Sequence, residues 1–392
     1  MAAAGIKQGN YTIDDLKDLK VALVHYWLVT WRGGEKVLAS LLKIFPKADI
    51  YTLFYDEKTC RPYLGNHAVH ASCLNLPKLR FQYQKIFPLY PLGIRSLKLK
   101  KKYDLIFSSE SGPAKGIANP DRIPHICYVH SPMRYCWGFT DMYLEALPKW
   151  SRSIAAWQFR KLKEWDLTTI DNVDFYLANS DNVKDRIKQY YGKDATTCYP
   201  PIAMDLFAGN SKRRIGDYYL SFGALTPYKG IRLLVETFNK LNKKLIVIGD
   251  GSEKKKLQAM ANDNIEFLGS LPYDTVVEYI QNTRALLFPG EEDFGLIPLE
   301  VMSQGVPVIA YKKGGALETV VENRNDISRS SGIFFEQQII DSLQEGLEYF
   351  ESVESEFDPD WIRNHARAFG EDRFIEKISS HICDFLNNRI SK

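Results

Sequence analysis

Long apolar runs are missing from this chain of 392 residues. A helix that spans a membrane needs about 20 consecutive apolar residues, and no stretch reaches that length. The first twenty residues carry acidic side chains early and no extended apolar core, which is not the pattern of a secretory signal. The formal net charge of +3 is too small to indicate nucleic-acid binding by itself. We therefore expect a globular protein of the cytoplasm.

Paired cysteine motifs are missing as well. The six cysteines stand singly at positions 60, 73, 127, 136, 198 and 383, and no C-x-x-C pair occurs. This spacing indicates neither a zinc ribbon nor a redox motif, and reduced thiols are the simplest interpretation. Hydrophobic residues make up 45% of the chain, which at this length is enough for two domains with full cores.

The sequence does contain a repeated alternation of apolar runs, glycine turns and helical spacing. Val21–Trp27 is a nearly continuous apolar run, Gly33 and Gly34 follow it, and residues 36–45 have apolar side chains at helical spacing. The same alternation restarts at residues 218–223, after the polar stretch 209–217, which indicates a domain boundary nearby. Strands that alternate with helices predict parallel sheets and an α/β fold.

The segment 288–320 carries the clearest chemical pattern. An apolar run ends at Phe288, and the following loop contains Glu292, while Glu300 lies in a helix expected at about 298–304. Open α/β sheets place ligands at such loops. Helix amides flanked by glycines suit a diphosphate, and a carboxylate can bind sugar hydroxyls. On these residues alone, an ordinary loop with solvated acids is the alternative.

The complete pattern, E-D-F-G-x-x-P-x-E followed by G-x-P-V-I-A and G-G-x-x-E, resembles the donor-site signature of retaining GT-B glycosyltransferases of family GT4. The segments SSESGPAKGI and HICYVHSPMRYCWG are similar to those of bacterial surface-polysaccharide mannosyltransferases of that family. The resemblance covers roughly residues 20 to 385. It implies two Rossmann-like parallel-sheet domains that face each other across a cleft. We divide the chain into an acceptor-side domain (1–205), a nucleotide-sugar donor domain (206–370) and a helix that crosses back to the first domain (371–392).

The resemblance also implies an activity. We expect a retaining glycosyltransferase that moves mannose from GDP-mannose to a lipid-linked glycan acceptor in surface-polysaccharide biosynthesis. Three alternatives remain: a GT4 enzyme with another donor, such as rhamnose or glucose, a GT-B nucleotide-sugar epimerase, and a non-enzymatic nucleotide-sugar-binding protein.

By resemblance, Glu292 contacts the transferred sugar, Lys229 the donor diphosphate and Glu300 the ribose. His130 ends a strand expected at 125–130, and its family equivalent lies against the transferred sugar. Many family members have an arginine at the position of Ala224, and Arg232 is our candidate to replace it. The further residues that we assign to donor binding are Gly33, Gly34, Gly223, Phe294, Gly295 and Leu296.

Lys115 and Arg134 follow strands on the same expected edge as His130. Each could bind an acceptor phosphate, or pair with acids nearby, and the sequence leaves both interpretations open. Three tryptophans at 150, 157 and 165 lie in a largely helical region, and we expect them to pack in a core or between domains.

The segment 78–102 holds eight Lys or Arg residues and no Asp or Glu, with aromatic residues between them. Such a surface suits an anionic membrane, so we expect peripheral attachment to the inner face of the cytoplasmic membrane. A solvated face is the alternative, and nucleic-acid binding is the least favoured one. Asp358 and Asp360 form a D-x-D pattern before a helix, where capping is the favoured role. Since Lys229 and helix N-termini are available for the diphosphate, we expect no metal and no cofactor beyond the nucleotide sugar.

Overall fold

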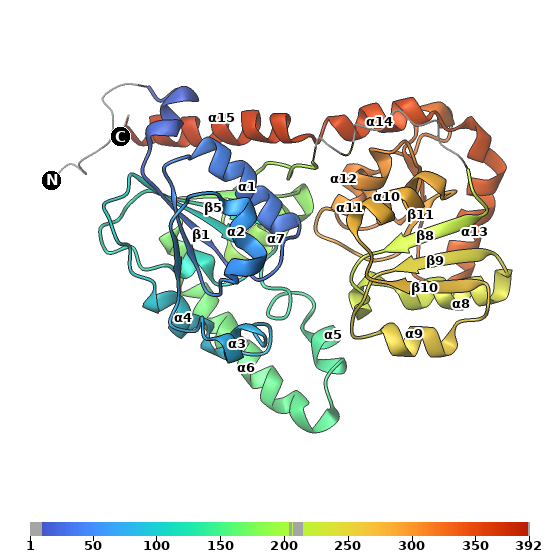
Figure 1. Cartoon of the computed structure of the whole chain (residues 1–392), viewed down its shortest axis with the longest axis horizontal. Helices are drawn as coiled ribbons and strands as arrows, with labels where there is room; N and C mark the ends of the chain where they lie inside the picture. Colours follow the sequence, from blue (N-terminus) through green and yellow to red (C-terminus); the bar gives the residue numbers. More distant parts are fainter. Residues whose placement is uncertain (1–9, 204–205, 207–214, 391–392) are drawn as a thin grey trace. The chain divides into compact units, whose positions relative to one another are not determined.

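The computed structural model describes residues 10–203, 206 and 215–390, and these form two compact units. Unit 1 comprises residues 1–201 and 371–392, and unit 2 comprises residues 202–370. The domain boundary predicted between residues 205 and 206 adjoins residues 204–205, which lie outside the described ranges. Residues 209–214 of the polar stretch lie outside them as well. Figure 1 shows helices on both faces of the sheet in each unit.

Unit 1 is built on a seven-stranded sheet in which every neighbouring pair is parallel, in the order β3-β2-β1-β4-β5-β6-β7. Its strands are β1 (Val21–His25), β2 (Asp49–Thr52), β3 (Val69–Ala71), β4 (Leu105–Glu110), β5 (His125–Val129), β6 (Phe175–Ala178) and β7 (Ala195–Thr197). Its helices are α1 (Gly33–Ile44), α2 (Glu57–Leu64), α3 (Pro77–Arg80), α4 (Tyr90–Ser96), α5 (Thr140–Glu145), α6 (Arg152–Leu167), α7 (Asp181–Tyr191) and α15 (Glu371–Ile390).

The apolar run of β1 is continuous because both faces of this sheet are covered. Leu23 belongs to a core cluster that includes α1 and α15, whereas Val24, pointing to the other face, packs with residues of β2 and α4. Helix α15 contributes Phe374, Ile378, Ile382 and Leu386 to the Leu23 cluster, at intervals of four residues along one face. Residues 371–390 are therefore a structural part of unit 1.

Unit 2 has a six-stranded parallel sheet in the order β10-β9-β8-β11-β12-β13. Its strands are β8 (Tyr218–Phe222), β9 (Lys244–Ile248), β10 (Ile265–Gly269), β11 (Leu286–Phe288), β12 (Val308–Tyr311) and β13 (Gly332–Phe335). Its helices are α8 (Ile231–Leu241), α9 (Lys254–Met260), α10 (Tyr273–Asn282), α11 (Leu296–Met302), α12 (Ala316–Thr319), α13 (Ile340–Val353) and α14 (Pro359–Arg367). The two predicted parallel sheets are confirmed.

Two expectations about helices were wrong. Helix α11 begins at Leu296 rather than near 298, because Gly295 has a positive φ of 97° and starts the helix two residues earlier. On α6 the buried face contains Ala155, Phe159, Leu162 and Asp166, so other positions face outward. Trp157 on α6 is accordingly 53% exposed, and Trp150, in the turn before α6, is 81% exposed. Of the three tryptophans, Trp165 packs partly against the core. In the part of the chain that the structure describes, no helix combines the length and the hydropathy of a membrane span.

Candidate active site

The carboxyl ends of β1, β4 and β5 lie next to one another and carry polar side chains. In the register of the parallel pairs, His25 lies beside Ser109, and Glu110 lies beside Val129. The next residue after β5 is His130, whose amide donates a hydrogen bond to the carbonyl oxygen of Glu110 at 2.8 Å. The structure thus places His130 directly after β5, at the carboxyl end of the sheet. Its contact with a sugar stays a prediction.

A hydroxyl connects His130 to a second histidine. Ser109 Oγ lies 2.8 Å from His130 Nε2 and 3.1 Å from His25 Nδ1. Burial, and secondly the charge of His130, hold the pKa of His25 well below its usual range, so this imidazole is neutral. Sequence reasoning missed Ser109 and His25, because a serine and a histidine inside buried strands carry no motif; only their position at strand ends could have signalled them.

Gly33 and Gly34 are the first two residues of α1, which thus begins three residues before the helix expected at 36–45. The structure adds a steric reason for the second glycine. A Cβ atom at Gly34 would lie 2.3 Å from the hydroxyl oxygen of Tyr26. The next residue, Glu35, is buried and accepts a hydrogen bond from the amide of Arg32 at 2.9 Å, which closes the first turn of the helix. Burial raises the pKa of Glu35 to about 7, an unusual property that the sequence did not reveal.

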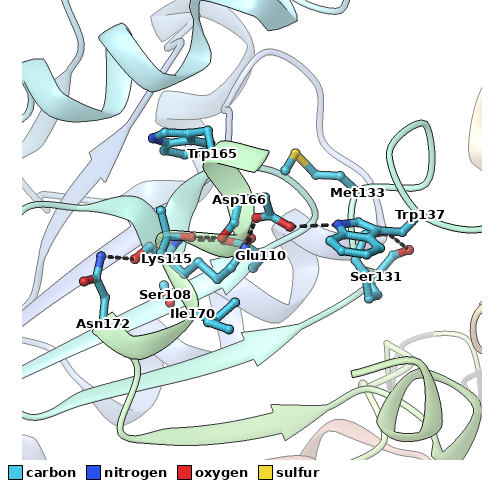
Figure 2. Close-up of polar contacts among 12 residues, drawn as sticks. Ser108, Glu110, Lys115, Ser131, Met133, Trp137, Trp165, Asp166, Ile170 and Asn172 are labelled. Atoms are coloured by element: carbon cyan, nitrogen blue, oxygen red, sulfur yellow. Dashed lines mark hydrogen bonds and ion pairs between the residues drawn. The ribbon is translucent and has the colours of Figure 1, made fainter. Parts of the chain in front are cut away.

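Lys115 does not face a ligand, and this corrects one of the two interpretations left open for it. Its side chain is fully buried, and its ammonium group contacts the carboxylates of Glu110, at 2.8 Å, and Asp166 (Figure 2). Trp137 Nε1 donates a hydrogen bond to the other oxygen of Asp166 at 2.9 Å. Burial, partly opposed by the lysine, raises the pKa of Glu110 to about 7. The pairing with local acids is thus the correct interpretation, and binding of an acceptor phosphate is excluded by burial.

Arg134 lies in the loop after β5. Its side chain is half-buried, and its guanidinium carbon is 5.1 Å from the centre of the Phe139 ring. This contact is compatible with either interpretation, so acceptor binding by Arg134 stays a prediction.

In unit 2, the loops after β8, β11 and β12 are neighbours, because these strands are adjacent in the sheet. They bring Lys229 and Glu292 into a direct ion pair although the two residues are far apart in the sequence. Both side chains are largely but not fully covered, with 13% and 17% of their surface exposed. The sequence assigned both residues to one site, and the structure joins them; their pairing with each other was not foreseen.

Close backbone contacts hold these three loops together and explain the glycines. A Cβ atom at Gly290 would lie 2.8 Å from the carbonyl oxygen of Tyr228, and one at Gly314 would lie 2.5 Å from that of Glu292. The amide of Gly315 donates a hydrogen bond to the same Glu292 oxygen at 2.9 Å. These contacts therefore hold the backbone on both sides of the ion pair.

The remaining predicted donor residues of unit 2 gather at the start of α11, with one exception. Gly223 follows β8 and has a positive φ of 130°. A Cβ atom at this position would lie 3.1 Å from the side chain of Ile297. Phe294, Gly295, Leu296 and Glu300 lie just before or within α11. The exception is Arg232, which is 73% exposed and pairs with Glu236 at 2.7 Å along α8. Many family members have an arginine at the position of Ala224, and that Arg232 takes over its role stays a prediction.

Asp358 accepts hydrogen bonds from the amides of Asp360 and Trp361 at 2.9 and 3.3 Å, so the predicted capping of α14 is confirmed. Across residues 10–203, 206 and 215–390, no group of three His, Cys, Asp or Glu side chains could hold a metal ion.

Comparison with known proteins gives two adjoining family matches. A model described as Glycosyltransferase Family 4 matches residues 31–206, and one described as Glycosyl transferases group 1 matches residues 207–368. Alpha-1,3/1,6-mannosyltransferase ALG2 of Candida glabrata is 24% identical over 377 residues, which cover 80% of this chain and 81% of that protein. The GDP-mannose-dependent monoacylated alpha-(1-6)-phosphatidylinositol monomannoside mannosyltransferase of Corynebacterium glutamicum is 29% identical over 139 residues, covering 31% of this chain and 35% of that protein.

Among solved structures, Anabaena HepE in complex with UDP and glucose superimposes with a TM-score of 0.68 at 15% identity, covering 93% of this chain and 99% of the other. At this identity the likeness concerns the fold. With both halves matched by family models and two parallel-sheet units of the corresponding architecture, the chain belongs to glycosyltransferase family 4 and has the GT-B fold.

Proposed function

We propose that this glycosyltransferase is a retaining mannosyltransferase, which moves mannose from GDP-mannose to a lipid-linked glycan acceptor in surface-polysaccharide biosynthesis. Two relatives are mannosyltransferases by name, and one of these is described as GDP-mannose-dependent, which supports this donor. The resemblance of residues 108–117 and 125–138 to surface-polysaccharide enzymes supports the acceptor class.

The Lys229–Glu292 ion pair is the observation that carries the proposal. An ammonium group and a carboxylate, both mostly covered, hold each other in place in the loops after β8 and β11. A donor diphosphate offers the ammonium group a doubly charged partner, so Lys229 would exchange its carboxylate for phosphate oxygens. Glu292 would then be released to accept hydrogen bonds from sugar hydroxyls. The ion pair thus offers one group for the diphosphate of a nucleotide sugar and one group for its sugar.

In the reaction, the bond between the anomeric carbon and the diphosphate breaks, and a bond from the same face to the acceptor oxygen forms. The acceptor proton leaves with a diphosphate oxygen. Positive charge develops on the sugar and negative charge on the leaving group, so Glu292 and Lys229 would each stabilise one of them. Glu300 would hold the ribose. In unit 1, His130 and the loop of Gly33 and Gly34 stay predicted site residues. No divalent ion is needed in this scheme.

A donor panel tests the proposal. The full-length protein is incubated with GDP-mannose, UDP-glucose, UDP-galactose and a dTDP-rhamnose donor, with and without a membrane-lipid extract, and nucleotide release and product are followed. We expect acceptor-dependent turnover of GDP-mannose and an α-linked product by NMR. Turnover of another donor would overturn the mannose assignment. Interconversion of nucleotide sugars without acceptor indicates an epimerase, and binding without turnover indicates a non-enzymatic role.

We further propose that unit 1 attaches to an anionic membrane. Within the segment 78–102, Phe81 is 83% exposed, whereas Tyr90 is buried in the core, so fewer aromatic residues face outward than the sequence suggested. The exposed face of α6 supplies additional apolar groups. Phe87 joins the two regions, because its ring centre lies 5.0 Å from that of Phe159 on α6. The exposed apolar side chains of this membrane-facing surface are Leu76, Phe81, Leu89, Leu92, Trp150, Ile154 and Trp157.

Cations surround these apolar groups. Lys78, Lys85 and Arg95 are exposed within the segment, and Lys149 and Arg160 are exposed near or on α6. Apolar side chains enter the interface between headgroups and acyl chains while cations bind anionic headgroups, so the combination favours a peripheral attachment. Such attachment would bring the enzyme to a lipid-linked acceptor on the cytoplasmic face.

A further inference from the structure

The chain His25–Ser109–His130 has a definite hydrogen-bond direction. Both imidazoles contact the same hydroxyl group, at 3.1 and 2.8 Å, and Ser109 is only 1% exposed. A serine hydroxyl has one hydrogen, so it can donate to one ring and must accept from the other. Two directions are possible, and they give opposite tautomers of His130.

The second ring nitrogen of His25, Nε2, decides between these two hydrogen-bond directions. Among the residues that the structure describes, no hydrogen-bond partner lies near the buried His25 Nε2. A buried N–H group without an acceptor is rarer and costlier than a buried lone pair without a donor. The single proton of this neutral ring therefore resides on Nδ1, which donates to Ser109 Oγ.

The direction then continues to His130. Because Ser109 Oγ accepts from His25, its own buried hydrogen needs an acceptor, and His130 Nε2 lies at 2.8 Å. A neutral imidazole that accepts at Nε2 carries its proton on Nδ1. The backbone holds His130 beside Ser109, since the His130 amide donates a hydrogen bond to the carbonyl oxygen of Glu110, the residue after Ser109.

We propose that Ser109 and His25 are positioning residues that hold His130 as the Nδ1–H tautomer, so that His130 offers a hydrogen-bond donor from Nδ1 during sugar transfer. The part that concerns transfer rests on the proposed function, whereas the tautomer itself does not. A ring without the Ser109 contact would exchange between both tautomers, and the fraction in the productive form would fall.

Nitrogen-15 NMR of histidine-labelled protein tests the tautomer directly. Long-range proton–nitrogen correlations at pH 8, above the usual histidine pKa of about 6.5, distinguish protonated from unprotonated ring nitrogens. Loss of one signal set in His130→Gln assigns the ring among the seven histidines. We expect a protonated Nδ1 and an unprotonated Nε2 in the wild type, and a mixture of tautomers in Ser109→Ala. A wild-type ring protonated at Nε2 would overturn the inference without the use of any variant that must fold.

Ser108→Ala is a matched control. Ser108 is the neighbouring residue of the same strand, and its hydroxyl contacts His125 Nε2 at 2.8 Å. Its removal should change the His125 signals and leave those of His130 unaltered. His25→Phe removes the donor at the start of the chain and should also produce a mixture at His130. An unchanged His130 tautomer in both Ser109→Ala and His25→Phe would refute the assigned role.

Kinetics test the positioning role. Ser109→Ala should lower kcat about tenfold with a smaller change in the donor KM, as expected for the loss of one orienting hydrogen bond. Ser109→Thr, which retains the hydroxyl, should recover most of this loss. A mixed tautomer with unchanged kcat would overturn the positioning role, while the proposed function would stand as long as Glu292→Gln is inactive. Absence of any nucleotide-sugar turnover in the wild type would instead refute the proposed function.

Discussion

At the residue scale, the two carboxylates of the donor region should have different kinetic effects. Glu292 would act on charge that develops in the transition state, whereas Glu300 would bind ribose equally before and during reaction. We expect Glu292→Gln to lower kcat by roughly 100-fold or more, in the range for a lost transition-state contact. Glu300→Gln should mainly raise the donor KM, by about tenfold for roughly 1.4 kcal/mol of lost binding. Steady-state kinetics with varied donor at saturating acceptor measure both values.

The ion pair adds one requirement to that experiment. Because Glu292 also contacts Lys229, thermal unfolding of Glu292→Gln should be compared with that of the wild type. A folded Glu292→Gln variant with near wild-type kcat would show that the loop after β11 does not act on the reacting sugar.

A second residue-scale prediction concerns pH and Glu35. Burial raises the pKa of Glu35 from 4.5 to about 7, so the folded protein binds this proton more tightly than the unfolded chain. The resulting stabilisation is present below about pH 4.5 and is lost as pH rises through 7, amounting to about 3 kcal/mol. Glu35→Gln, which can still accept the hydrogen bond from Arg32, should equal the wild type near pH 4.5 and exceed its unfolding free energy at pH 8.

Urea unfolding at both pH values measures this difference in unfolding free energy. Glu110 also has a raised pKa, but its effect on stability is the same in both proteins and cancels in the difference. Glu57→Gln, at a side chain that is 75% exposed, is the control and should change little with pH. If the stability difference between Glu35→Gln and wild type were the same at both pH values, the charge of Glu35 would not be suppressed by burial.

At the element scale, the buried ion network fixes β4 to α6. Lys115, between Glu110 at the end of β4 and Asp166 on α6, balances two carboxylates that are at most 1% exposed. Lys115→Met would leave both carboxylates without a cation, and loss of one buried partner typically costs about 3–5 kcal/mol. Lys161→Met is the matched control, because the Lys161–Glu164 pair is half-exposed and should contribute less than about 1 kcal/mol. Chemical unfolding compares them, and a Lys115→Met variant as stable as the control would contradict this account.

The exposed face of α6 leads to another element-scale prediction. Removing Trp150 and Trp157 together by substitution with serine should weaken binding to anionic vesicles at least about tenfold. The reason is that burying one large apolar side chain contributes roughly 1.5–3 kcal/mol. Substitution of Lys78 and Lys85 by glutamate should weaken binding mainly at low salt, since surface cations contribute about 1 kcal/mol each.

Sedimentation with phosphatidylglycerol vesicles measures both changes. Ile339→Ser and Tyr273→Ser, at side chains of unit 2 that are 50% and 40% exposed, control for a general loss of apolar surface. Equal sedimentation of the wild type and the tryptophan variant would count against membrane attachment through this surface.

The same elements show what the sequence could predict. Glycines and acids around Glu292 are close together in the chain and follow a strand, so local pattern was enough to place them. Lys115 depends on Asp166, which is 51 positions away, and only tertiary packing brings the two together. The exposure of Trp157 follows from which face of α6 meets the sheet, and helical spacing alone does not determine that face. The pair of Lys229 and Glu292, 63 positions apart, was missed for the same reason.

At the scale of the whole molecule, we predict that transfer does not depend on a divalent ion. The charge of the diphosphate would be met by Lys229 and by backbone amides near α11, as proposed above. Activity should therefore persist largely unchanged in excess EDTA. Complete loss of activity in EDTA, restored by magnesium or manganese, would refute this and direct attention to Asp358 and Asp360. A magnesium-treated sample without EDTA provides the reference rate.

The path of the chain through the two units has a consequence for synthesis on the ribosome. Helix α15 belongs to the core around Leu23, yet residues 202–370 of unit 2 are made before it. At about 5–20 residues per second, translation of that stretch takes roughly 10–30 s. During this interval the face of β1 and α1 that receives Phe374 and Ile378 has no cover, while unit 2 can already complete its own sheet. We therefore expect unit 1, whose synthesis begins first, to finish folding last, with an apolar face that chaperones can bind in the interval.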